Sequence, residues 1–144
     1  MNLANIRLTN FLSPMKITVR KGGWWRLNME IKINGKTQEL NFGVKFVRLL
    51  DKKMPIVMNV KGMGEQPFGM ALTRVVPALK TFDTAVLSDV IYLALWGSKP
   101  RPSQEDVDAF IDDDKTDIEK LFSDVIDAMS KSNSVKLATK NLKA

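Results

Sequence analysis

The sequence predicts an α+β fold, in which an N-terminal β-hairpin packs on a mostly helical single domain of about four to five helices. Three observations lead to this prediction. The chain has 144 residues, the size of one domain, and 44% of them are apolar, enough for a core. Apolar and polar residues alternate before Asn34-Gly35. Beyond residue 42, apolar residues recur at spacings of three and four, as in amphipathic helices.

The predicted hairpin is centred on Asn34-Gly35. The residues before this pair alternate between isoleucine and lysine, as in a half-buried strand, and residues 36–40 return as the second strand. Asn and Gly both tolerate positive φ, so the pair suits a two-residue turn whose twist matches the flanking strands.

The first predicted helix follows the hairpin directly. Phe42, Phe46, Leu49 and Leu50 would share one face of it, and Asn41 is placed where an N-cap is expected. The hairpin and this helix would bury one common apolar face, so they form the expected nucleus of the fold.

Two further helices are predicted in the middle of the chain. The first covers residues 68–79, and Pro77 is expected to kink or end it because proline lacks the N–H that the helix needs. The second covers residues 83–96, and its wide apolar surface predicts a central position. Gly97 is expected to end this second helix.

The last two predicted helices begin with capping boxes. Ser103 opens one and Thr116 opens the other, each with an acidic residue three positions later. Residues 105–119 hold eight acids and one lysine, which we interpret as a solvated face that suits helix N-termini. An acidic patch that recognises a basic partner is the alternative. Residues 135–144 are expected to form a short, frayed, basic tail.

Basic charge is concentrated at the N-terminus. The net charge is +6, and residues 1–28 carry five Lys or Arg and no acid, whereas residues 29–144 carry 17 Lys or Arg against 16 acids. Trp25-Arg26 can be encoded TGG-AGG, which would put a ribosome-binding sequence just upstream of the Met29 codon. We therefore predict that residues 1–28 are a non-native or disordered extension and that residues 29–144 form the domain. A basic arm that binds nucleic acid is the alternative, and an Arg26 codon other than AGG would remove the argument.

Neither a catalytic constellation nor a metal site is predicted. The chain has no His and no Cys, which removes the usual general base, thiolate chemistry, disulfides and the commonest zinc ligands. Its carboxylates gather on one acidic helix rather than across a cleft. No apolar run reaches the roughly 18 residues of a membrane helix. We therefore expect a soluble protein that is not an enzyme, needs no cofactor, and works through its surface.

Methionine marks a candidate surface for a partner. Four of the eight Met residues lie between residues 54 and 70, in a segment punctuated by Pro and Gly. Met adapts to varied partners, although the same residues also fill irregular gaps in cores. The sequence does not separate core from partner face, so the candidates come from this segment and from the apolar helices. They are Met54, Met58, Met63, Phe68, Met70, Phe46, Leu50, Phe110 and Phe122.

Three segments resemble the tail assembly chaperones of siphophages and prophages of Gram-positive bacteria. They are MEIKINGKTQELNFGVKFVRLLDKK, KPRPSQEDVDAFID and DIEKLFSDVIDAMSKSN. Their order and spacing carry the resemblance, which covers residues 29–144. Such proteins bind the long, helical tape measure protein, keep it soluble, and help recruit tail tube subunits. The resemblance therefore implies a homo-oligomer that works in the host bacterial cytoplasm and is absent from the mature virion.

The resemblance also implies a second, longer product. Many such chaperones undergo a programmed frameshift near the end of the short form, and the longer product contacts the tube protein. Thr139-Lys140-Asn141 can be encoded ACA-AAA-AAC, which contains a slippery heptamer of the −1 type. A small basic nucleic-acid-binding phage protein and a structural tail component are the alternative functions.

Overall fold

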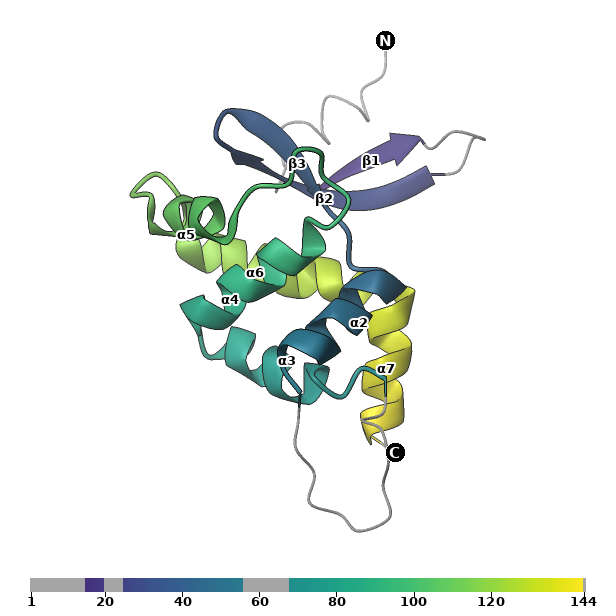
Figure 1. The fold of residues 1–144 in the computed structure, drawn as a ribbon. Coiled ribbons are helices and arrows are strands. Elements are labelled where there is room, and N and C mark those ends of the chain that lie inside the picture. Colours follow the sequence, from purple (N-terminus) through teal and green to yellow (C-terminus); the bar gives the residue numbers. More distant parts are fainter. Residues whose placement is uncertain (1–14, 20–24, 56–67, 144) are drawn as a thin grey trace.

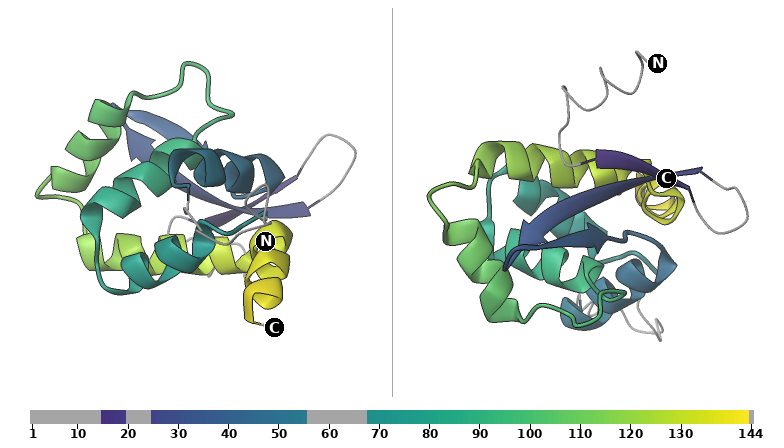
Figure 2. Two further views of the ribbon diagram at one scale, coloured as in Figure 1. Left: turned by 60° about the horizontal axis from the view of Figure 1, so that its bottom comes forward. Right: turned by 90° about the horizontal axis from the view of Figure 1, so that it is seen from above.

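The computed structural model describes residues 15–19, 25–55 and 68–143. The described part is an α+β domain, as predicted, with a three-stranded antiparallel sheet on one side of a helical layer (Figure 1). Seen from above, β2 and β3 cross between α6 and α2 (Figure 2).

The sheet has the order β1-β2-β3, where β1 is Met15–Val19, β2 is Trp25–Ile33 and β3 is Lys36–Leu40. The long strand β2 is shared between its neighbours, because its first half pairs with β1 and its second half with β3. Met29 is the junction of the two ladders, paired with Met15 on one side and Leu40 on the other.

The predicted hairpin is confirmed, and so is its turn. Asn34 has φ 53° and Gly35 has φ 77°, the two successive positive values that a type I′ turn requires. Ile31 and Ile33 are buried while Lys32 between them is exposed, which is the alternation that the sequence predicts.

Strand β1 was not predicted. It lies within residues 1–28, and β2 begins four residues before Met29, so the backbone of this region continues the sheet. The assignment of residues 1–28 to an extension concerns the start of the gene product, and it stays a prediction.

Six helices are described. They are α2 (Val44–Lys53), α3 (Leu72–Lys80), α4 (Thr84–Ala94), α5 (Gln104–Asp112), α6 (Ile118–Lys131) and α7 (Asn133–Lys143). Helix α4 packs against α2, α3 and α5, which confirms its predicted central position. Its buried residues include Val90, Ile91 and Ala94, each 0% exposed.

The helix starts follow the sequence closely, with three corrections. Helix α3 begins at Leu72, four residues later than predicted. The Ser103 capping box is confirmed, since its side chain accepts from the Asp106 N–H and the Asp106 carboxylate accepts from the Ser103 N–H. This backbone hydrogen bond from Ser103 holds the pKa of Asp106 below its usual range. Helix α2 begins after Gly43 rather than after Asn41, whose side chain instead accepts from the Gly43 N–H.

The N-cap of α6 is Asp117, one residue later than predicted. Its carboxylate accepts from the Lys120 N–H at 3.2 Å. The Thr116 hydroxyl donates instead to the Phe110 carbonyl at 2.7 Å, so it ties the end of α5 to the start of α6.

Helix α3 does not end at Pro77 but continues to Lys80. Proline lacks only its own N–H, and the Pro77 carbonyl still accepts from the Thr81 N–H at 3.1 Å. The helix ends in a Schellman motif, in which the Asp83 N–H bonds to the Ala78 carbonyl. The position that usually holds glycine is Phe82, with φ 62°.

The predicted frayed tail is wrong, because residues 133–143 form helix α7. Val135 and Ala138 are buried, at 3% and 2% exposure, and α7 packs against α6, α3 and α2. Because α7 is mostly polar and, among its described side chains, buries only Val135 and Ala138, its apolar pattern is too weak to predict a helix. Its structure depends on packing against the other helices.

Helix α4 also carries Asp89, a partly buried acid that gives a pH-dependent prediction. Burial raises the pKa of Asp89 above its ordinary value of 3.8, and this outweighs the opposing attraction of Lys53. The folded chain therefore binds this proton more tightly than the unfolded chain, so stability falls as the pH rises through the range just above 3.8.

We expect Asp89→Asn to unfold at a higher temperature than wild type near neutral pH, with a gain that disappears in acid below 3.8. Thermal unfolding followed by circular dichroism from acidic to neutral pH measures this. Asp112→Asn, at an exposed position, is the control. A gain that persists unchanged in acid would contradict burial as the cause.

Candidate partner-binding surface

The structure divides the predicted partner-binding residues into two groups. Phe46 and Leu50 are 0% exposed and Phe122 is 1% exposed, and Met54 is also buried at 9%. These four side chains belong to the core of the folded chain. Met58 and Met63 lie outside the described residues.

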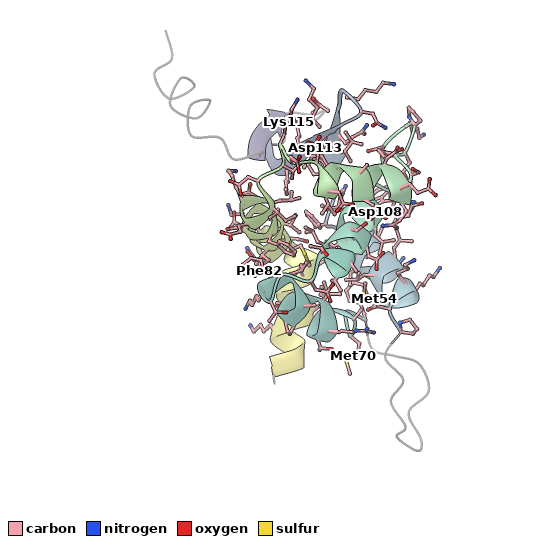
Figure 3. The ribbon with its side chains drawn as sticks, turned by 90° about the vertical axis from the view of Figure 1, so that its left-hand side faces the viewer. Met54, Met70, Phe82, Asp108, Asp113 and Lys115 are labelled. Atoms are coloured by element: carbon pink, nitrogen blue, oxygen red, sulfur yellow. The ribbon has the colours of Figure 1, made fainter. Side chains whose placement is uncertain are left out.

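The other candidates reach the surface. Phe68 is 46% exposed, and Met70 and Phe110 are partly exposed. Met54 and Met70 lie at one end of the molecule, and Asp113 and Lys115 lie at the other (Figure 3). The structure therefore separates the surface formed by α2 and Phe68 from the surface around Phe110.

A groove lies along the outer face of α2 beside Phe68, and we call it the α2 groove. Its apolar residues are Val44, Leu49 and Phe68, of which Val44 is 50% exposed. Its remaining described lining residues are Lys45, Arg48, Asp51 and Lys52. The groove thus joins two of the segments predicted to contact a partner, the first helix and the Met-rich segment.

Asp51 fixes the turn that carries Phe68. One carboxylate oxygen accepts from the Gly69 N–H at 2.8 Å, and the other accepts from the Ala71 N–H at 3.0 Å. These bonds join the last turn of α2 to the backbone just before α3, so the position of Phe68 beside α2 depends on them.

We expect Asp51→Asn to destabilise the fold by about 1–3 kcal/mol, because an amide has one acceptor oxygen and leaves a backbone N–H facing another donor. Urea unfolding measures the change. Asp112→Asn, at an exposed position on α5, is the matched control and is expected to stay within about 0.5 kcal/mol of wild type. Equal midpoints for the two variants would contradict a role for Asp51 in holding the turn.

The charge along the α2 groove is mainly positive. The Lys45 ammonium lies 4.7 Å from the centre of the Trp96 ring, a cation–π contact that limits its motion. Among the described residues, neither Arg48 nor Lys52 forms an ion pair. The described lining contains one acid, Asp51, and it bonds to backbone N–H groups.

A second pocket, of about 410 Å³, lies between the hairpin and the α5–α6 turn. Phe110 and Leu121 line it together with residues of both charges, including Lys115, Lys120 and Asp124. Lys120 and Asp124 pair with each other at 2.7 Å. This balance of charge gives the pocket no evident preference for a partner of one sign.

Three exposed apolar residues were not among the predicted partner-binding residues, namely Val44 in the α2 groove, Phe82 and Leu137. Phe82 is 58% exposed and packs edge-on against Phe122, with ring centres 5.3 Å apart. Leu137 on α7 is 61% exposed. The end of α3 has no glycine, and an aromatic residue, Phe82, takes the position of positive φ. No sequence signal shows that the backbone of Phe82 adopts this conformation.

In the part of the chain that the structure describes, no helix is long and apolar enough to span a membrane. The same residues contain no group of three or more acidic side chains placed to hold a metal ion.

These features describe a small α+β protein with an apolar groove exposed on one helix, a surface suited to contact with another protein. The family model for the phage tail assembly chaperone protein (TAC) matches residues 30–143, and the chain belongs to this family. No curated protein and no solved structure gives a match. The family confirms the resemblance drawn from the three sequence segments.

Proposed function

We propose that this chaperone binds the tape measure protein of its phage through the α2 groove, keeps it soluble during tail assembly, and helps recruit tail tube subunits. The observation that carries the proposal is the apolar floor of the α2 groove, in which Val44 and Phe68 are exposed and Leu49 is partly buried. A long client with apolar stripes needs many contacts of modest affinity, so several copies would line it as a homo-oligomer. The complex forms in the host cytoplasm, and the chaperone leaves before the virion is complete.

Helix α7 is compatible with the longer, frameshifted form that would contact the tube protein. The proposed slip site at Thr139, Lys140 and Asn141 follows the buried residues Val135 and Ala138. Both products would therefore keep the packing of α7. Mass spectrometry of the product of the intact gene tests this, and a Lys140 codon of AAG would exclude slippage here.

Co-expression with the tape measure gene of the same phage tests client binding. We expect wild-type chaperone to raise the soluble fraction of the client severalfold and to co-purify with it. The double variant Val44→Ser/Phe68→Ser should lose most of this effect, because it removes exposed apolar surface while leaving the core intact.

Leu137→Ser is the matched control, since Leu137 is as exposed as these residues but lies outside the groove. A client that is equally soluble with and without the chaperone would refute the function. A client that is solubilised equally by the wild type and the double variant would refute only the choice of surface.

A further inference from the structure

We propose that the α2 groove selects amphipathic client helices whose apolar stripe is flanked by acidic residues. This inference rests on the proposed function, because it specifies which segments of the client the groove accepts. Three observations support it: the shape of the groove, the positive charge along it, and the hydrogen bonds of its acidic residue Asp51 to backbone N–H groups.

The shape favours a helix as the occupant. Val44, Arg48 and Lys52 are spaced by four residues, so they form a row along α2 of about 12 Å. A row of this length spans about two turns of a docked helix, whose apolar residues at i, i+3 or i+4, and i+7 would contact Val44, Leu49 and Phe68. An extended peptide would need open backbone groups to pair with, whereas the backbone within α2 is already hydrogen-bonded.

The charge favours acidic flanks. Lys45, Arg48 and Lys52 line the groove, and the Asp51 carboxylate bonds to two backbone N–H groups. An acidic residue beside the apolar stripe of a client gains attraction from this positive charge, and a basic residue there is repelled. The groove therefore both favours acidic-flanked stripes and disfavours basic-flanked ones, which is a basis for specificity.

The apolar floor favours a protein over a nucleic acid. Phosphate groups would satisfy the lysines and arginine, but they would leave Val44, Leu49 and Phe68 without apolar contacts. The acidic helix α5 of a second copy is the alternative occupant, since Phe110 on it is partly exposed. Both occupants can be distinguished experimentally from a client helix.

Two labelled synthetic helical peptides of about 18 residues provide the probes. They share one leucine stripe and differ only in flanks of Glu or Lys. We expect the full chain to bind the Glu-flanked peptide at least about tenfold more tightly at low salt, with a smaller difference at about 0.5 M salt. The triple variant Lys45→Glu/Arg48→Glu/Lys52→Glu should reverse the preference.

The matched control reverses three exposed lysines outside the groove, in Lys36→Glu/Lys80→Glu/Lys99→Glu. It makes the same change in net charge and should keep the wild-type preference. A milder variant with Gln at positions 45, 48 and 52 should abolish the preference, and equal thermal unfolding temperatures would show that all variants are folded.

Several results would overturn the inference. They are equal affinity for the two peptides, an unchanged preference in the triple variant, and tighter binding of a DNA duplex than of the Glu-flanked peptide at the same groove. Self-association that is lost in the triple variant and in Asp112→Lys/Asp113→Lys/Asp114→Lys would assign the groove to a second copy instead. If client solubility needs Phe68 but not the basic residues, the proposed function stands and the inference fails.

Discussion

Replacing Phe46 with alanine is expected to destabilise the domain by about 3–5 kcal/mol. The side chain is 0% exposed and packs edge-on against Phe42, with ring centres 5.0 Å apart. Its removal leaves a cavity beside Phe42 on the buried face of α2, and the surrounding chain refills such a cavity only in part. Because small domains are stable by about 5–15 kcal/mol in total, this loss is a large fraction of the stability.

The matched variant is Phe68→Ala, which removes the same phenyl group from a side chain that is 46% exposed. We expect it to change stability by no more than about 0.5 kcal/mol while weakening client binding. Urea unfolding and client co-purification, measured on both variants, separate the two roles. Wild-type stability together with lost client binding in Phe46→Ala would show that Phe46 reaches the partner after all.

This pair shows what the sequence could not predict about the site. Phe46 and Phe68 have the same side chain. A phenyl group gains the same free energy on leaving water whether the core of the domain or a partner protein buries it, so its identity does not show which of the two it contacts. The separation depends on which face of α2 meets α4, α3 and α7, and on the Asp51 bonds that hold the Phe68 turn. Both are long-range contacts, which local patterns do not encode.

The fold was predictable where local signals agree with tertiary packing. The Asn34-Gly35 turn, the Ser103 capping box and the apolar run of α4 each combine a backbone preference with burial. Helix α7 and strand β1 lack that combination in different ways. Residues 15–19 alternate as Met-Lys-Ile-Thr-Val, which is a strand signal, but they lie in a basic segment interrupted by Gly22-Gly23, where no longer period supports it.

The contact between Gly69 and helix α7 gives the second large effect. Gly69 has φ +82°, and a Cβ at this position would lie 2.5 Å from the Ala138 Cβ. Gly69→Ala therefore places an L-residue in the left-handed region and also forces α7 away from the turn before α3. We expect the two effects together to cost about 2–4 kcal/mol, measured by urea unfolding.

Two other glycines separate the contributions of backbone conformation and close packing. Gly35 has φ +77°, and no atom lies within 4 Å of the point that a Cβ would occupy there, so Gly35→Ala carries only the conformational cost, about 1–2 kcal/mol. Gly97 has neither a positive φ nor a close neighbour, so Gly97→Ala should be nearly neutral. The excess of Gly69→Ala over Gly35→Ala then measures the clash with α7.

A double-mutant cycle assigns that excess to Ala138. Ala138→Gly removes the opposing methyl group, so it should cost less in the Gly69→Ala background than in wild type. The difference is expected to be roughly 1–2 kcal/mol, the size of the relieved overpacking. If the two changes are additive, or if Gly69→Ala unfolds no more easily than Gly35→Ala, then α7 does not pack against this turn. The close approach at Gly69 would then have no structural role.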